Sequence, residues 1–289
     1  MNFVFLTEGT GQGLSEKSNV SRLAGSLVDD ADQRVHLENG CGAQDAFFGR
    51  LVGSDAVDIL LNHYKWLAQQ GAFRRPDADI FIFGFSRGAL VARVLADLIC
   101  NVGVPVDAYD ARRVFKYYRS RYHEALQALR KEKRLSEPFR VKYLGLWDSV
   151  DSTVGIRGED YVRLPALVEC ARHAIARDEC RRFFRPLSCE GAEEAVFPGT
   201  HSDVGGTYPD NHVIADLTLG WIANKGVEKG LRLKDGVVFD ENVDLSKAVI
   251  HDSLEEPTNA WGRIEPVRRV LDGIRRHAAC AKVLFKGAD

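Results

Sequence analysis

The sequence predicts an α/β fold with a mostly parallel central sheet flanked by helices. Short apolar runs alternate with stretches of helical periodicity along the chain, which is typical of parallel strands joined by helical crossovers. Of the 289 residues, 45% are hydrophobic and 28% are charged, as in ordinary globular proteins. We expect a single domain over residues 1–289, with the weakest periodicity after about residue 226.

Each apolar run predicts a strand, and the segments between them predict helices. The first run ends in the loop Thr7–Gly13, which has three glycines in five positions and can lie close to a ligand. Ser18 is a candidate cap for the helix after this loop. The expected strands cover residues 2–7, 35–38, 79–83, 140–146 and 192–197. The expected helices cover residues 19–27, 57–70, 89–100, 110–133, 164–178, 214–224 and 265–284.

Charge and composition exclude several classes of protein. The formal charge is −2, whereas dedicated nucleic-acid binders usually have a basic excess. We find neither a secretory signal nor an apolar span of about 20 residues, so we expect a protein made in the cytoplasm without a signal peptide. The pairs His201/Asp203 and Asp210/His212 lack a third ligand at a defined spacing. We therefore expect no metal, no cofactor and no nucleic-acid partner.

The segment Gly84-Phe85-Ser86-Arg87-Gly88 stands between an expected strand and an expected helix. This context exposes the serine hydroxyl on a sharp turn, as in a nucleophile elbow. The backbone N–H of Arg87 is then one candidate for an oxyanion hole, and Gly9 and Thr10, after the first strand, are candidates for the other. The alternative is a glycine-rich turn that only packs or holds a phosphate.

A serine nucleophile needs a base and an acid that orients the base. Asp148 follows the strand after the Ser86 helix, and His201 follows the next expected strand. The order Ser, Asp, His fits an α/β-hydrolase, and the carboxyl ends of parallel strands meet at one edge of the sheet. Asp203 is an alternative acid and His251 an alternative base. We interpret the remaining histidines as surface or packing residues: His36, His63, His123, His173, His212 and His277.

Basic and aromatic residues also gather in the expected helical segment 110–133. They are Arg112, Arg113, Lys116, Arg119, Arg121, Tyr117, Tyr118 and Tyr122. One interpretation is a solvated helix face. The other is a peripheral contact with anionic lipid headgroups.

Four motifs in this order resemble one α/β-hydrolase family of bacteria and fungi, which includes phospholipase effectors of the bacterial type VI secretion system. The motifs are Gly84-Phe85-Ser86-Arg87-Gly88-Ala89, Trp147-Asp148-Ser149-Val150, the segment from His173 to Glu179, and the segment from Phe197 to Gly206. Asn19-Val20-x-Arg22-Leu23-Ala24 and His251-Asp252-Ser253 are also similar to it. The matches run from about residue 3 to residue 255.

The resemblance implies a serine hydrolase of lipid esters, with Ser86 as nucleophile and Asp148 and His201 as its partners. It also implies a lipid or acyl-ester substrate, a secretion-system or immunity partner, and export by a non-classical secretion route. The family's first loop usually reads Asp-Gly-Thr, whereas this chain has Glu8-Gly9-Thr10. The effectors' long membrane-engaging extensions have no counterpart in this length. A soluble esterase or thioesterase and a non-catalytic hydrolase-fold binding module therefore stay open as alternatives.

Overall fold

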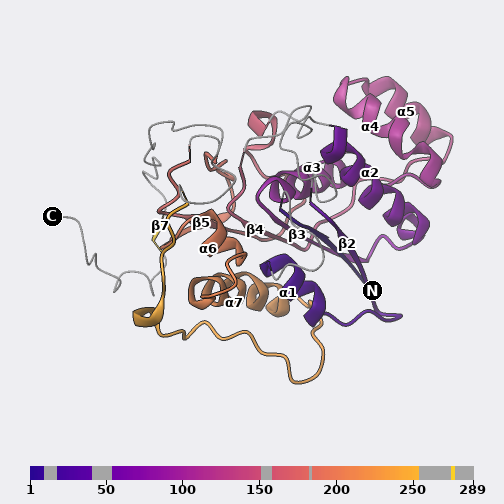
Figure 1. Cartoon of the computed structure of the whole chain (residues 1–289). Coiled ribbons are helices and arrows are strands. Elements are labelled where there is room, and N and C mark those ends of the chain that lie inside the picture. The colour runs from indigo at the N-terminus through magenta and orange to yellow at the C-terminus, as the bar shows by residue number, and fades with distance from the viewer. Residues whose placement is uncertain (10–17, 41–53, 151–157, 182–183, 254–274, 277–289) are drawn as a thin grey trace.

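A single parallel sheet organises the computed structural model, which describes residues 1–9, 18–40, 54–150, 158–181, 184–253 and 275–276. Within these residues seven strands pair in the order β2-β1-β3-β4-β5-β6-β7 (Figure 1). Every neighbouring pair is parallel. The strands are β1 (Asn2–Thr7), β2 (Gln33–Glu38), β3 (Asp79–Phe85), β4 (Tyr143–Trp147), β5 (Ala171–Ala176), β6 (Glu193–Phe197) and β7 (Arg275–Arg276).

Helices cover both faces of the sheet, α2 and α3 on one side and α1 and α7 on the other (Figure 1). The α-helices are α1 (Asn19–Ser26), α2 (Ser54–Gln69), α3 (Arg87–Asn101), α4 (Ala111–Arg119), α5 (His123–Lys131), α6 (His201–Gly205) and α7 (Val213–Glu228). The short 3₁₀ turns are η2 (Ala72–Arg74), η3 (Ala108–Asp110), η4 (Gly158–Tyr161) and η5 (Leu245–Lys247).

The two faces of the sheet contribute to two separate hydrophobic clusters. On β1, Phe3 and Phe5 join the cluster under α2 and α3. Val4 and Leu6 join the cluster with α1 and α7. All four side chains are fully buried, so this strand has apolar residues at consecutive positions rather than in alternation. That is the pattern of a parallel strand covered on both faces.

The carboxyl ends of the strands lie level with one another. Thr7 pairs with Gly84, Phe85 with Trp147, and Ala176 with Phe197. The loops that follow β1, β3, β4, β5 and β6 therefore leave the sheet at the same edge, which is where ligands bind in open α/β sheets.

The expected helix over residues 164–178 is wrong, because β5 occupies Ala171–Ala176. Alanine and arginine favour helix in isolation, so the three alanines and the arginine of β5 favour a helix over a strand locally. The segment is instead inserted between β4 and β6 and is almost wholly buried. Tertiary burial has overridden the local preference.

The expected C-terminal helix over residues 265–284 is also wrong at the two residues described there. Arg275 and Arg276 form β7, which pairs with Ala195 and Val196 of β6. The remainder of that expected helix lies outside the described residues. The expected helical segment 110–133 is a pair of helices, α4 and α5, separated at Arg121, whose φ is +53°.

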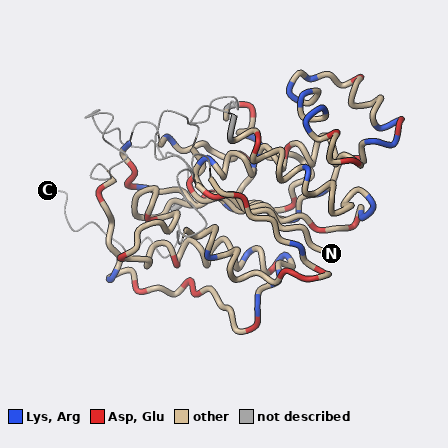
Figure 2. Tube along the Cα trace, turned by 45° about the vertical axis from the view of Figure 1, so that its right-hand side comes forward, with Lys and Arg blue, Asp and Glu red and all other residues tan. Residues whose placement is uncertain are grey.

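Charged residues are frequent along the α4–α5 pair, where the tube in Figure 2 has several blue and red segments. Several of the expected basic and aromatic residues have partners within the molecule. Arg112 pairs with Asp58, Arg113 with Asp110, and the Tyr118 hydroxyl donates to Asp97. Val114 and Phe115 are buried, so the helix turns one apolar face inward and its basic residues toward solvent, the pattern of a solvated helix face.

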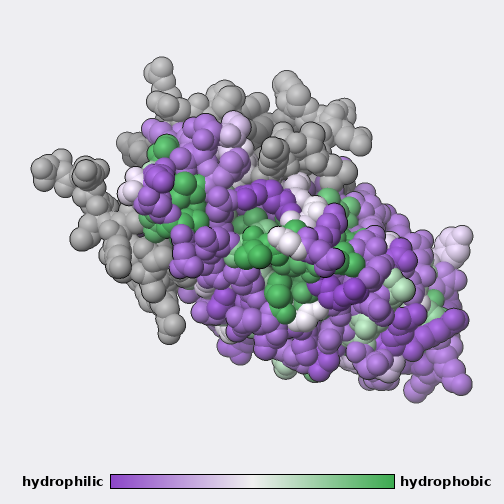
Figure 3. Space-filling view, turned by 90° about the horizontal axis from the view of Figure 1, so that it is seen from below, coloured by the Kyte–Doolittle hydropathy of each residue, from purple (hydrophilic) through white to green (hydrophobic). Residues whose placement is uncertain are grey.

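The opposite side of the molecule is less polar in places. Seen from below, on the side of α1 and α7, apolar residues are visible between hydrophilic ones (Figure 3). Exposed apolar residues on α7 and the chain after it include Val227, Val238, Val249 and Ile250. Among the described residues, no helix combines the length and apolar character needed to span a bilayer.

Candidate active site

Ser86 lies in the sharp turn between β3 and α3. Its φ is +60° and its ψ is −126°, a conformation that is strained for a residue with a Cβ. The Ser86 N–H donates to the carbonyl of Trp147 at 2.9 Å, which fixes the turn to β4. A Cβ added at Gly84 would collide with the carbonyl of Gly88, so glycine is required for this close approach. α3 begins directly at Arg87 and directs its positive end toward Ser86.

Three side chains form a hydrogen-bonded chain at this turn. His201 Nε2 lies 2.8 Å from Ser86 Oγ, and His201 Nδ1 lies 2.6 Å from Asp148 Oδ2. Since a carboxylate only accepts, Nδ1–H donates to Asp148 and Nε2 is left to accept from the serine hydroxyl. Ser86 is 3% exposed, His201 4% and Asp148 0%, so the structure brings the three predicted residues together away from bulk water.

Backbone contacts hold Asp148 in an unusual conformation, with φ +39°. Its N–H donates to Ala174 O at 2.7 Å, and its Oδ1 accepts from Ala176 N at 2.9 Å. Both partners belong to β5, the strand that the sequence failed to predict. Asp148 is therefore positioned by the neighbouring strand β5 as well as by β4, which it follows.

His173 and Glu194 brace the same turn, whereas His173 was expected only to be a surface or packing residue. Ser149 N donates to His173 Nε2 at 3.0 Å. The other ring nitrogen, Nδ1, lies 2.8 Å from Glu194 Oε1. His173 is fully buried on β5. The motif from His173 to Glu179 is the sequence signal for this role. The role could be predicted from it only if residues 171–176 were expected to form a strand.

His201 is the first residue of the short helix α6. Its N–H faces Glu179 Oε2 at 3.2 Å, and its ring lies against Phe85 and Phe184, with centroids 4.6 and 4.8 Å away. Glu179 is buried and pairs with Arg181 at 2.8 Å. Burial raises the pKa of Glu179, but the hydrogen bonds and charge of Arg181 outweigh it and give a net lowering. His201 is thus held by its backbone and by two aromatic rings.

The electrostatic surroundings keep His201 neutral near neutral pH. Burial is the largest influence and lowers the pKa of His201 below its ordinary value. The hydrogen bond and charge of Asp148 oppose that shift, and the charge of Arg181 adds to it. A neutral imidazole is the form that can accept a proton from serine.

Asp203 and His251, the alternative acid and base, have other partners. Asp203 accepts from Thr200 N at 2.8 Å and from Thr200 Oγ1 at 2.9 Å, and so caps α6. His251 Nδ1 lies 2.6 Å from Asp203 Oδ1, and His251 Nε2 lies 3.1 Å from Asp210. With both ring nitrogens facing carboxylates, His251 is not arranged to accept a proton from Ser86, whose hydroxyl already contacts His201.

Comparison with known proteins identifies the family. A family model for the catalytic domain of Tle1-like phospholipase effectors of the type VI secretion system (T6SS) matches residues 1–225. The chain belongs to this family. The resemblance and the α/β-hydrolase-like fold expected from the sequence are confirmed, and the family is one of hydrolases.

Individual relatives are more distant. An uncharacterized protein of Saccharomyces cerevisiae is 31% identical over 127 residues, which cover 39% of this chain and 19% of that protein. An uncharacterized protein from Pseudomonas aeruginosa has a similar structure, with a TM-score of 0.53 at 16% identity over 81% of this chain and 46% of that one. A Tle1 effector bound to the VgrG spike of the type 6 secretion system gives a TM-score of 0.43 at 20% identity, covering 72% of this chain and 51% of that one. The chain therefore spans about half of these relatives or less.

The first loop of this Tle1-like domain lies against the serine turn. A Cβ added at Gly9 would lie 2.6 Å from the Phe85 ring and 3.4 Å from Ser86 Cβ. The preceding residue, Glu8, is fully buried and accepts hydrogen bonds from Ser18 and Ser21 at the start of α1. The longer carboxylate thus has a defined place, tied to α1. Thr10 lies outside the described residues.

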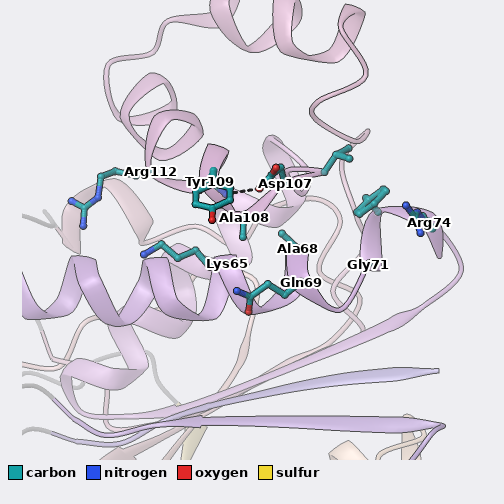
Figure 4. Close-up of a pocket in the computed structure, with 11 residues that line it drawn as sticks. Lys65, Ala68, Gln69, Gly71, Arg74, Asp107, Ala108, Tyr109 and Arg112 are labelled. Carbon is teal, nitrogen blue, oxygen red and sulfur yellow. Dashed lines mark hydrogen bonds between the residues drawn. The ribbon is translucent and has the colours of Figure 1, made fainter.

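A separate open pocket of about 750 Å³ lies between α2 and the segment before α4 (Figure 4). Lys65 and Gln69 border it from α2, and Asp107 and Tyr109 border it from the other side. Tyr109 is 95% exposed. Neither Ser86 nor its hydrogen-bonded partners line this pocket, so it is distinct from the candidate active site of the Tle1-like domain.

Proposed function

We propose that this Tle1-like domain is a serine ester hydrolase that cleaves the carboxylic ester bonds of lipids, with phospholipids as its substrate class. Ser86 is the nucleophile, His201 the general base and Asp148 the acid that orients it. The observation that carries the proposal is the contact of His201 with both Ser86 Oγ and Asp148 Oδ2, at 2.8 and 2.6 Å. Ser86 itself lies in the sharp turn between β3 and α3. Membership of a phospholipase effector family supports the lipid substrate.

The proposed reaction is acyl transfer in two halves. His201 Nε2 takes the Ser86 proton while Oγ attacks the ester carbonyl, and the resulting oxyanion is held by the N–H groups of Arg87 and of Gly9 or Thr10. Collapse of this intermediate breaks the ester bond, and His201 gives its proton to the departing alcohol. Water, deprotonated by His201, then attacks the acyl-enzyme and releases the carboxylic acid with Ser86 regenerated.

Asp148 and the positive end of α3 stabilise the charges that form during the proposed reaction. Asp148 is fully buried and accepts the Nδ1–H of His201, so it stabilises the imidazolium that forms when His201 takes a proton. The positive end of α3, which begins directly after Ser86, stabilises the oxyanion that forms when Ser86 attacks the ester.

We extend the proposal to export through the type VI secretion system, since a similar Tle1 effector is bound to a VgrG spike.

A fluorophosphonate probe, read by intact mass, tests the reaction without a known substrate. Wild type is expected to take up one probe, Ser86→Ala none, and His201→Ala to react about 10²–10⁴-fold more slowly. His251→Ala should retain far more reactivity than His201→Ala. A folded wild type that stays unlabelled would overturn the proposed function in favour of a non-catalytic binding module.

The lipid substrate is tested separately. Labelled phospholipid vesicles and a soluble short-chain ester are supplied to wild type and to Ser86→Ala. Faster release of fatty acid from vesicles than of product from the soluble ester supports a lipase. Activity on the soluble ester or on a thioester alone would replace the lipase by a soluble esterase or thioesterase that uses the same three residues.

A further inference from the structure

His251 is held between two carboxylates, Asp203 and Asp210, which come from α6 and the loop that follows it. Its Nδ1 lies 2.6 Å from Asp203 Oδ1, and its Nε2 lies 3.1 Å from both oxygens of Asp210. The Tyr208 ring stacks on it at a centroid distance of 3.7 Å. A neutral imidazole has one N–H, whereas two carboxylates require two donors. The arrangement therefore favours the imidazolium form.

The inner carboxylate, Asp203, connects His251 to α6. The Asp203 side chain is only 1% exposed. It accepts from the N–H and the hydroxyl of Thr200 at 2.8 and 2.9 Å, and from the N–H and Nδ1 of His251 at 3.2 and 2.6 Å. Without the His251 ring, the buried charge would keep the two Thr200 donors and the backbone N–H of residue 251, but it would lose the imidazolium beside it.

The dependence of α6 on this cap follows from its length. α6 has five residues, and helices this short are not stable without tertiary support. His201 is its first residue and Asp203 its third. A change in how Asp203 is held therefore moves the turn that carries the His201 ring.

We propose that His251 is a positioning residue, which clamps Asp203 and thereby holds the first turn of α6 so that His201 stays between Ser86 and Asp148. This inference rests on the proposed function for its catalytic consequence. The role differs from that of a base, since His251 acts through Asp203 and exchanges no proton with the substrate. The groups that face its ring are Asp203, Asp210 and Tyr208, and Asp252 is its neighbour along the chain.

Three variants separate the contacts of His251. His251→Ala removes the ring contacts with Asp203 and Asp210 and leaves the backbone N–H that donates to Asp203. His251→Asn places an amide N–H near the position of Nδ1 and keeps the donor to Asp203. Asp210→Asn keeps an acceptor for Nε2 and changes only the outer, solvent-exposed partner, whose side chain is 64% exposed.

The first measurement is the rate of fluorophosphonate labelling of Ser86 as a function of probe concentration. A misplaced base slows the chemical step, and a displacement of about 1 Å can cost up to about 10²-fold. His251→Ala is expected to lower the limiting rate by about 10-fold or more with an unchanged half-saturating concentration. His251→Asn should recover most of that loss, and Asp210→Asn should stay within about twofold of wild type. Equal limiting rates for wild type and His251→Ala would overturn the inference.

The second measurement does not depend on catalysis. The His201 Nδ1–H that donates to Asp148 is followed as a downfield resonance in the proton NMR spectrum of each folded variant. Its signal is expected to be lost or shifted in His251→Ala and preserved in His251→Asn. An unchanged signal in His251→Ala overturns the positioning role, whether or not wild type labels. A wild type that fails to label overturns only the proposed function. If His251→Ala does not fold, His251→Gln takes its place, because its amide reaches toward Asp210 rather than Asp203.

Discussion

His173 accepts a hydrogen bond at 3.0 Å from the backbone N–H of Ser149, the residue that follows Asp148. The donor is a backbone group, so His173 Nε2 must be without a proton, and Nδ1–H is directed at Glu194. Asp148 itself has a φ of +39°, a conformation that needs support from its surroundings. The turn that carries the proposed acid is thus held by a histidine and a carboxylate that take no part in the reaction.

We expect His173→Ala to lower the free energy of unfolding by about 2–4 kcal/mol, because it leaves a cavity and removes partners from buried polar groups. Labelling of Ser86 should also slow, since the Asp148 turn loses its brace. Urea unfolding and the labelling rate check both effects. The control is His123→Ala on the exposed side of α5, and equal stability of the two variants would contradict the brace.

Gly9→Ala should lower both stability and the labelling rate. The new Cβ would lie 2.6 and 2.8 Å from two atoms of the Phe85 ring, and overpacking of this kind costs about 1–3 kcal/mol. The ring also lies against His201, so the displacement reaches the proposed base.

Gly25→Ala is the matched control for that change. Gly25 lies in α1, and a Cβ there meets nothing within 4 Å. The substitution should stabilise the protein by about 0.5–1 kcal/mol through helix propensity and leave labelling unchanged. If Gly9→Ala and Gly25→Ala label at the same rate, the first loop has no part in the active site.

The labelling rate should rise with pH through a value below the ordinary pKa of histidine, about 6.5. Burial lowers the pKa of His201 despite the opposing influence of Asp148, and only the neutral imidazole accepts the Ser86 proton. The measurement is the labelling rate between pH 4 and pH 8, with intact fold verified by circular dichroism. A midpoint above about 6.5 would show that burial does not govern this base.

Two neighbouring histidines, the fully buried His63 and the half-buried His36, should make the protein sensitive to acid. His63 lies between Thr7 Oγ1 at 2.9 Å and His36 Nδ1 at 2.8 Å. Burial lowers the pKa of His36 to about 4. Burial, followed by the charge of His36, lowers the pKa of His63 well below its ordinary value. Both histidines are therefore neutral in the native protein over the weakly acidic range.

The sign follows from proton linkage. Between the ordinary pKa, about 6.5, and the lowered values, the unfolded chain binds more protons than the native protein. The stability from these histidines is present above about pH 6.5 and is lost as pH falls toward 4. Urea unfolding between pH 4.5 and 7.5 should show a smaller loss for His63→Gln than for wild type. His123→Gln is the control, and parallel curves for all three proteins would refute the assignment.

Much of the fold could be predicted from the sequence because its elements carry strong local signals. The run Asn2–Thr7 became β1 with the predicted bounds, since a strand buried on both faces is apolar without interruption. Gly84, Ser86 and Gly88 predicted the turn between β3 and α3, because only this spacing of glycines permits the backbone approaches found there. Because Ser86, Asp148 and His201 each follow an expected strand, the sequence also predicted that they meet at the carboxyl edge of the sheet.

The sequence alone left three matters to the tertiary structure. β5 could not be predicted because its alanines and arginine favour a helix locally, and only burial between β4 and β6 makes it a strand. The choice between His201 and His251 depended on which carboxylates meet each ring, and those contacts join residues 41 to 53 positions apart. The supporting residues His173, Glu179 and Glu194 act through buried hydrogen bonds across strands and loops. Local patterning therefore determined most of the elements and the turn that carries Ser86, whereas long-range packing and charge decided how His201 and Asp148 are held.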